Sequence, residues 1–356
     1  MTSGGGKKVL VATNEPALSP GWERGYRHYG WECDYGSRAF LNKTGRYDIV
    51  HILWPEEYSD WIDPTPRRLS ELESVLKHWS RQSTIICTAN NLFPHYVRDR
   101  RTAKLLYDLF YRYCDLITHL TETSKRLVIE NFDSAKCKRH VVHGQLPYDV
   151  TLESQVSRGE KRQALNLKQS DFVVLLFGSI RDQSELNLIK QSVVQSGLES
   201  LRLLVVGRAA TPTCLTNWWR RLAWNMWLRR NGAVACGFIP EQELADPIDS
   251  SDVILVPRIG GLNSAQVMIG MTFGRAMIVP DSPQYLEPIA GTANIIYKTG
   301  DAGSLASALR EASLIDLKKI GRANAKLART WTWDRIVGKC LDEMTLIASK
   351  ECSPGA

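Results

Sequence analysis

One stretch of the sequence has the order of residues that builds an anion-binding site. It begins at Gly260, reads as loop, helix start and short helix, and leads into an apolar strand-like run. Gly260 and Gly261 let the backbone approach a ligand closely, and Asn263 or Ser264 can cap the helix. The free N–H groups of a first helical turn and the helix dipole attract phosphate. The stretch therefore predicts a nucleotide site, although an ordinary connection of an α/β domain has the same pattern.

Polar and charged residues follow most of the strand-like runs. Because open parallel sheets bind ligands at the carboxyl ends of their strands, these are the positions where we expect chemistry. In the first half of the chain they include Asn14, Glu56, Asn90, Asn91, His95, Glu122 and His143. In the second half they include Gly178, Arg181, Gly207, Arg208, Phe238 and Arg258. The acids, imidazoles and amides of the first half suit an acceptor and its base. The glycines and arginines of the second half suit a diphosphate.

The elements that must position these residues alternate in type along the whole chain. Strand-like runs are predicted at 7–14, 47–54, 83–90, 116–121, 140–144, 172–178, 201–207, 233–237, 252–257, 276–280 and 293–297. Helical patterns between them indicate βα repetition and hence parallel sheets. The polar segment 145–168 is typical of a linker. We therefore predict an α/β protein with two Rossmann-like domains facing a cleft, at 1–150 and 151–330, and a C-terminal helix in 331–356 that packs back toward the first domain.

Composition excludes several classes of protein. The chain has 356 residues, 44% of them hydrophobic and 23% charged, and a formal net charge of +7. No run reaches the ~20 apolar residues of a membrane span, and no signal-peptide core precedes the first strand, so we expect a cytoplasmic protein. The eight cysteines are scattered, without metal-ligand or disulfide spacing, and there is no Asp-x-Asp motif. Neither a metal nor any other cofactor is expected beyond the substrate.

Two basic runs are interleaved with aromatic residues. In 98–113, four arginines and a lysine alternate with tyrosines and a phenylalanine, and in 218–230 four tryptophans stand among four arginines. Such runs are typical of helices that lie on an anionic membrane surface. They also fit amphipathic helices packed on a sheet, and no nucleic-acid-binding motif accompanies them. We therefore expect peripheral association with the inner leaflet through these helices, and no nucleic-acid partner.

Several ordered patches resemble a known family. They lie at 47–56, 88–95, 177–181, 206–207, 210–212 and 263–276. These patches resemble GT-B glycosyltransferases of the family 4 type, in particular bacterial exopolysaccharide enzymes such as the xanthan-type β-mannosyltransferases. The resemblance implies transfer of a hexose, with mannose from GDP-mannose favoured, from a nucleotide sugar held by the second domain. It also implies a lipid-linked oligosaccharide as acceptor.

The chain departs from the family pattern at three places. Gly261 and Ile269 occupy the positions of the two glutamates that family 4 members usually carry. Ser184 stands where a lysine commonly follows the arginine at 181, and Asn90 replaces the first histidine of a His-Asn-Leu-x-Pro-His pattern. These departures leave two alternatives open: a non-catalytic partner subunit with this fold, and a nucleotide-sugar epimerase. A dinucleotide oxidoreductase is disfavoured because no Gly-x-Gly-x-x-Gly follows the first strand.

Glycosyl transfer requires stabilisation of the leaving diphosphate and, for inversion, a base for the acceptor hydroxyl. Glu56 and His95 are the predicted bases, since each follows a first-half strand and can be tuned toward neutrality. His119 and His143 are reserve candidates for contacts to the donor sugar or its phosphates, and His51 is expected to be buried structure. The donor-binding residues are predicted to be Gly178, Arg181, Phe238, Arg258, Gly261, Asn263 and Ser264.

Overall fold

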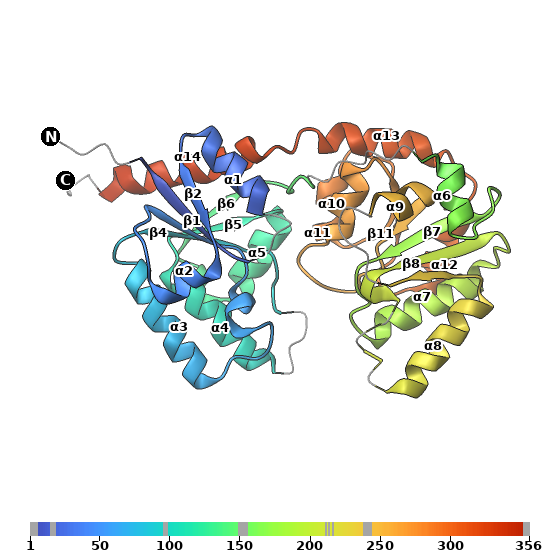
Figure 1. Cartoon of the computed structure of the whole chain (residues 1–356), viewed down its shortest axis with the longest axis horizontal. Coiled ribbons are helices and arrows are strands. Elements are labelled where there is room, and N and C mark those ends of the chain that lie inside the picture. Colours follow the sequence, from blue (N-terminus) through green and yellow to red (C-terminus); the bar gives the residue numbers. More distant parts are fainter. Residues whose placement is uncertain are drawn as a thin grey trace. The chain divides into compact units, whose positions relative to one another are not determined.

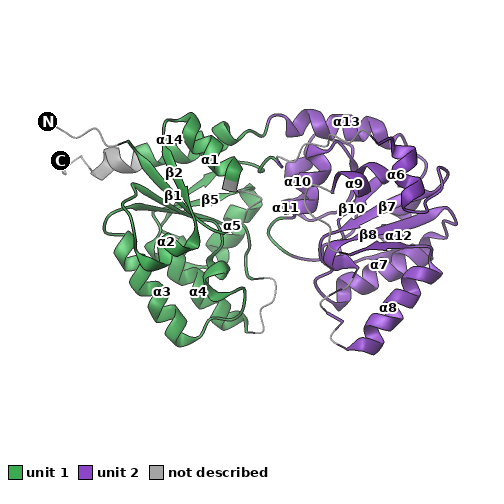
Figure 2. Ribbon diagram, in the orientation of Figure 1, with its two compact units in different colours: residues 1–147, 261–263, 331–356 green, residues 148–260, 264–330 purple. Residues whose placement is uncertain are grey.

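The computed structural model forms two compact units, coloured separately in Figure 2. It describes residues 6–14, 19–94, 99–148, 156–210, 212, 214–215, 217–237 and 244–351. The first unit comprises Met1–Pro147, Gly261–Asn263 and Trp331–Ala356, and the second Tyr148–Gly260 and Ser264–Thr330. The chain thus leaves the first unit three residues before the boundary predicted at 150.

The first unit is built on a six-stranded sheet in the order β2-β1-β3-β4-β5-β6. Every adjacent pair is parallel. The strands are β1 (Lys8–Ala12), β2 (Glu32–Tyr35), β3 (Ile49–Ile52), β4 (Thr84–Thr88), β5 (Leu116–His119) and β6 (Arg139–Val142). Five of them match predicted runs. The sequence pattern missed β2, which is an edge strand of mostly exposed residues and so lacks an apolar signature.

Helices cover both faces of this sheet (Figure 1). They are α1 (Ser19–His28), α2 (Ser37–Asn42), α3 (Pro66–Trp79), α4 (Arg100–Tyr113), α5 (Glu122–Asn131) and α14 (Trp333–Glu351), with the 3₁₀ turns η1 (Pro55–Ser59) and η2 (Asp133–Ala135). Helix α14 packs on α1, where the rings of Trp22 and Trp333 lie 5.3 Å apart. The C-terminal helix is therefore part of the first unit.

The second unit repeats this plan, with a parallel sheet in the order β12-β11-β10-β7-β8-β9. Its strands are β7 (Phe172–Phe177), β8 (Leu201–Val206), β9 (Val234–Cys236), β10 (Val253–Leu255), β11 (Ala276–Pro280) and β12 (Ile295–Tyr297). Helices α7 (Gln183–Ser196), α8 (Trp218–Arg230) and α12 (Ala302–Ala312) cover one face (Figure 1). The others are α6 (Arg158–Ala164), α9 (Ala245–Ser250), α10 (Ala265–Thr272), α11 (Pro283–Leu286) and α13 (Leu317–Ala328), with the turns η3 (Gly207–Ala209) and η5 (Glu287–Ile289).

The two basic-aromatic runs both form helices, but they differ in what they bury. In α4, the rings of Tyr107, Phe110 and Tyr111 lie in the core of the first unit. These three aromatic side chains mark the core-facing side of an amphipathic helix and are unavailable to a lipid surface. Within the described ranges, no helix combines the length and apolarity that crossing a bilayer requires.

Candidate functional site

The glycine turn at the carboxyl end of β7 has the backbone that a ligand loop needs. Gly178 has a φ of +87°, and the space where a Cβ would lie holds no other atom within 4 Å. Its carbonyl oxygen accepts a hydrogen bond from the backbone N–H of Ala209, at 2.6 Å, just beyond β8. The ends of β7 and β8 are therefore tied together, with open space left above the turn.

The Arg258 side chain and the Arg181 backbone both contact a single buried carboxylate, that of Glu185. Arg258 is buried, and its Nη1 lies 2.8 Å from Glu185 Oε2 and 2.8 Å from the carbonyl oxygen of Ser179. The backbone N–H of Arg181 donates to the same Glu185 oxygen at 2.8 Å, and its guanidinium donates to Gly260 O at 3.1 Å. The structure thus brings together two predicted donor-binding residues and Glu185, in the first turn of α7, which the sequence analysis missed.

Burial shifts the pKa values of the acid and of the base in this cluster in opposite directions. Burial raises the pKa of Glu185, with the charge of Arg258 opposing the shift. Burial also lowers the pKa of Arg181, and the like charge of Arg258 adds to the effect. The Arg258 guanidinium is paired with Glu185, whereas the guanidinium of Arg181 contacts the neutral carbonyl of Gly260 and brings a second positive charge close to Arg258. An anion such as a diphosphate would compensate that charge.

The Gly260 carbonyl is fixed from two sides. Besides Arg181, the hydroxyl of Tyr285 donates to this oxygen at 2.9 Å. Burial raises the pKa of Tyr285, so its hydroxyl stays protonated and able to donate at neutral pH. Tyr285 is a second residue of the site that sequence reasoning missed, because it lies in a short helix far along the chain from the glycine motif.

Helix α10 begins directly after the glycine motif, as the sequence predicted, but the polar residues at its start do not cap it with their side chains. Ser264 occupies the N-cap of α10 and its side chain makes no capping hydrogen bond. Its hydroxyl lies 3.3 Å from Gln266 Oε1, and Gln266 Nε2 donates to Phe177 O at the end of β7 at 2.5 Å. Gln266 therefore ties the start of α10 to the glycine turn, so the helix N-terminus and Gly178 belong to one site.

Gly261 and Asn263, two of the predicted donor-binding residues, belong to the first unit. Leu262 between them is buried in the core of the first unit. Asn263 Nδ2 donates to the carbonyl oxygens of Asn90 at 3.0 Å and Ala89 at 3.4 Å, and so it does not cap α10. Of the two residues predicted as caps, Ser264 occupies the N-cap position, but its side chain makes no capping hydrogen bond.

Glu56, the first predicted base, is fully buried in η1. Its Oε2 accepts from the Tyr107 hydroxyl at 2.6 Å and its Oε1 from Asn91 Nδ2 at 2.7 Å. Burial raises the pKa of Glu56, while these two donors oppose the shift. Both oxygens are thus engaged within the unit, and a role as base requires this arrangement to open.

Glu57 offers a second carboxylate beside it, and the sequence analysis missed it. Its oxygens accept from the Thr13 hydroxyl at 2.7 Å and from the backbone N–H of Asn14 at 2.8 Å. Glu57 is half-buried at the carboxyl ends of β1 and β3, where a ligand of this sheet would lie. Only its place directly after Glu56 could have drawn attention to it.

The reserve histidines form a buried cluster. His140 Nε2 lies 2.9 Å from Ala135 O, so it carries the proton, and His140 Nδ1 then accepts from His119 Nε2 at 2.8 Å. His143 Nδ1 donates to Gly144 O at 2.8 Å. This leaves His119 Nδ1 and His143 Nε2 as buried acceptors with no hydrogen-bond partner. Such nitrogens can accept from a hydroxyl group or water, but in this neutral form they do not donate to phosphate.

His51 is buried structure, as the flanking apolar residues predict. Its Nδ1 lies 3.0 Å from the Tyr26 hydroxyl and its Nε2 2.7 Å from Thr88 Oγ1. Burial lowers the pKa of His51 to about 3 and that of His143 to about 4. Both side chains are therefore neutral at physiological pH.

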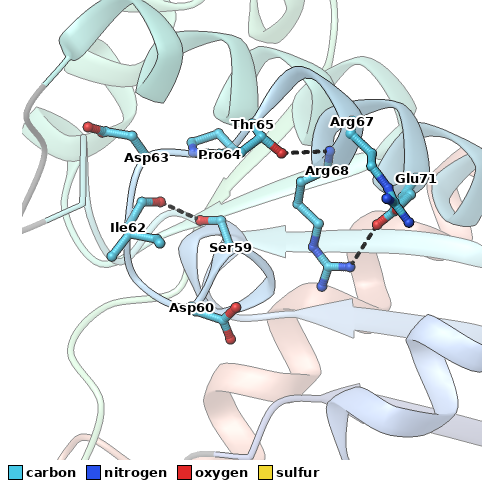
Figure 3. Close-up of a pocket in the computed structure, with 9 residues that line it drawn as sticks. All are labelled: Ser59, Asp60, Ile62, Asp63, Pro64, Thr65, Arg67, Arg68 and Glu71. Atoms are coloured by element: carbon cyan, nitrogen blue, oxygen red, sulfur yellow. Dashed lines mark hydrogen bonds and ion pairs between the residues drawn. The ribbon is translucent and has the colours of Figure 1, made fainter.

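The first unit also has a pocket of about 360 Å³ where η1 meets α3 (Figure 3). Its lining residues are Ser59, Asp60, Ile62, Asp63, Pro64, Thr65, Arg67, Arg68 and Glu71. The Arg68 guanidinium reaches Glu71, and the Thr65 hydroxyl accepts from the Arg68 backbone N–H. Carboxylates, hydroxyls and guanidinium groups together supply the donors and acceptors that a polar, sugar-like ligand needs.

Two predicted site residues, His95 and Phe238, lie outside the described residues. Within the described part of the chain, no group of three or more His, Cys, Asp or Glu side chains is arranged to hold a metal ion.

No protein-family model matches the sequence, and no curated protein matches it. Solved structures do resemble the fold. HepE from Anabaena in complex with UDP and glucose has a TM-score of 0.68 at 12% identity, covering 96% of this chain and 99% of that one. A glycosyltransferase from Rickettsia africae has a TM-score of 0.66 at 14% identity, covering 96% and 98%. The trehalose 6-phosphate synthase of Burkholderia multivorans has a TM-score of 0.59 at 12% identity, covering 96% and 83%. With its two six-stranded parallel sheets and their surrounding helices, this chain has the GT-B fold of these glycosyltransferases.

Proposed function

We propose that this chain is a glycosyltransferase that moves a hexose from a nucleoside diphosphate sugar to a lipid-linked oligosaccharide. The observation that carries the proposal is a pair of neighbouring arginines beside a helix N-terminus that has no side-chain cap. Arg258 is paired with the buried carboxylate of Glu185, and the guanidinium of Arg181 contacts a carbonyl oxygen. Arg181, Arg258 and the start of α10 supply positive charge and N–H donors at the carboxyl end of β7. A diphosphate is the ligand that this combination fits best.

The same groups would act on the leaving group. Charge develops on the diphosphate as the bond to the sugar breaks, and Arg181 and the N–H groups of α10 would stabilise it without a metal ion. Losing one comparable donor costs about 10²-fold in rate, or ~3 kcal/mol, in sites that stabilise an oxyanion. Gly178, which leaves space where a side chain would otherwise lie, lets the ligand approach the turn.

The first unit would supply the acceptor site and the base. Glu56 and His95 are the proposed bases, and His119 and His143 are the proposed reserve contacts. Because Glu56 is buried, its exchange for Gln has to be followed by thermal unfolding as well as by turnover. The pocket of Figure 3 is the proposed place for the acceptor's sugar rings. If turnover survives in a chain that carries both Glu56→Gln and His95→Ala, neither residue is the base.

UDP-glucose and GDP-mannose are the two donors to compare first. HepE, which shares the fold, was solved with UDP-glucose. The sequence resemblance instead implies GDP-mannose. We propose a nucleoside diphosphate hexose as the donor, with mannose favoured by the motifs, and an exopolysaccharide or other cell-surface glycan as the product. Association with the inner membrane surface is part of the same proposal, since a lipid-linked acceptor is held there.

Turnover tests the proposal directly. The full chain is incubated with UDP-glucose or GDP-mannose and a polyprenyl-diphosphate oligosaccharide extract, and release of UDP or GDP is followed. We expect acceptor-dependent release from one donor, reduced about 10²-fold in Arg181→Ala. Arg322→Ala, an exposed position on α13, is the matched control. Donor consumption without acceptor would indicate the epimerase, and nucleotide binding without any turnover would indicate the non-catalytic subunit.

A further inference from the structure

Helix α8 in the second unit is apolar on two opposite faces. Trp224 and Leu228 are buried in the core of the unit, and Trp227 packs against that core. The Trp224 and Trp227 rings stack at 5.2 Å, and Lys190 Nζ lies 5.9 Å from the Trp227 ring. Two of the four tryptophans of α8 are therefore accounted for by packing against the core of the unit.

The other apolar face is exposed to solvent. Trp218 and Trp219 are 60% and 63% exposed and stack on one another, and Leu222 and Met226 are exposed as well. With 3.6 residues per turn, these four side chains occupy an arc of about 100° directly opposite Trp224 and Leu228. A contiguous exposed apolar stripe of this kind marks an interaction surface rather than scattered surface residues.

The charge around the stripe is of one sign. Between Trp218 and Arg230 the helix has four arginines and no Asp or Glu. All four arginines are exposed. At about 100° per residue, Arg229 and Arg230 lie beside the stripe, whereas Arg220 and Arg221 lie beside the buried face. Exposed tryptophans among arginines match the headgroup region of a bilayer, where the indole rings insert at the interface and the guanidinium groups meet lipid phosphates.

We propose that α8 docks the second unit on an anionic lipid surface, with Trp218, Trp219, Leu222 and Met226 inserted and with Arg229 and Arg230 on the headgroups. The inference deepens the proposed function, because it names the surface that brings the nucleotide-binding unit to a membrane-held acceptor. Only the biological role of this contact rests on the proposed function. The contact itself does not, since binding to lipid requires no turnover. It also assigns the contact to α8 and not to α4, whose aromatic rings lie in a core.

Vesicle co-sedimentation tests the proposal. The full chain is mixed with phosphatidylcholine vesicles at low and at high salt. The vesicles contain either no anionic lipid or about 30% phosphatidylglycerol. We expect sedimentation with the anionic vesicles only, reversed by salt, because the arginines are screened. Two variants separate the two parts of the surface: Trp218→Ala with Trp219→Ala, and Arg229→Ser with Arg230→Ser. At about 1 kcal/mol per basic residue near the surface, the double Arg variant should bind about thirtyfold more weakly.

The matched control removes the same charge from α4, through Arg100→Ser and Arg101→Ser, which are exposed. We expect this control to bind like the unaltered chain, and all variants to keep its circular dichroism and melting temperature. The proposal is overturned if the unaltered chain stays in the supernatant with anionic vesicles at low salt, or if the α4 control loses as much binding as the α8 variants. It is also overturned if lipid-free chain associates with itself through α8, as shown by a dimer that Trp218→Ala with Trp219→Ala abolishes.

Discussion

Acidification should weaken the first unit selectively, because all seven histidines lie there. They are His28, His51, His78, His95, His119, His140 and His143, and none is in the second unit. Burial lowers the pKa of His51 to about 3 and that of His143 to about 4, against an ordinary value of 6.5. As the pH falls through 6.5, these two histidines become protonated in the unfolded chain but stay neutral in the folded unit. The stability present above pH 6.5 is therefore lost progressively until the folded pKa values are reached.

The size of the loss follows from the two pKa values. Between pH 7.5 and pH 5, the linkage relation gives about 2 kcal/mol for each of His51 and His143, or about 4 kcal/mol together. Burial also lowers the pKa of His119 well below its ordinary value, which adds to the loss. Glu56 acts in the opposite direction, since burial raises its pKa. A loss of about 4 kcal/mol is a large part of the ~5–15 kcal/mol that holds a typical domain folded.

Hydrogen exchange followed by mass spectrometry can measure this loss separately in the two units. After correction for the intrinsic exchange rate, peptides from β3, β5 and β6 should lose protection at pH 5, while those from β7, β8 and β10 serve as the internal control. A chain with His51→Gln and His143→Gln should show a much smaller dependence on pH, whatever its absolute stability. If peptides of both units lose protection equally, or if the double variant keeps the full dependence, the assignment to these histidines is wrong.

Two further predictions concern the second unit. Glu185→Gln should destabilise it by about 3–5 kcal/mol, because Arg258 would remain buried without its carboxylate. Hydrogen exchange of peptides from β7 and β8 in increasing urea measures this loss, and a change under about 1 kcal/mol would contradict it. Gly321→Ala should lower the melting temperature, since a Cβ there would lie 2.0 Å from Gly274 O. Gly303→Ala should change it little, because the new Cβ would meet only two side-chain oxygens, at 3.4 and 3.8 Å. Equal melting temperatures for the two variants would refute the argument.

The sequence predicted the parallel strands well because they are buried on both faces and read as continuous apolar runs. It missed β2, whose residues Glu32, Cys33, Asp34 and Tyr35 form an exposed edge and carry no such run. Pattern alone also could not separate α4 from α8. Both runs interleave aromatic and basic residues, and only tertiary packing decides which rings enter a core.

The candidate site was predictable in part for a similar reason. Arg181, Arg258 and Ser264 follow strands or open a helix, which is a local signal. Tyr285 joins them through the fold, and nothing in its own neighbourhood marks it. Glu185 lies only four residues after Arg181, but its pairing with Arg258 is made through the fold. Residues that act through contacts across the sheet are found only once the strand order is known.

The central claim is that the second unit binds a nucleoside diphosphate at Arg181 and the start of α10. Isothermal titration calorimetry of the full chain with UDP and with GDP tests it most directly, using Arg181→Ala and the exposed control Arg322→Ala. We expect one of the two nucleotides to bind, with affinity reduced at least tenfold, or ~1.4 kcal/mol, in Arg181→Ala and unchanged in Arg322→Ala. Binding of neither nucleotide, or equal affinity in Arg181→Ala and the unaltered chain, would contradict the account.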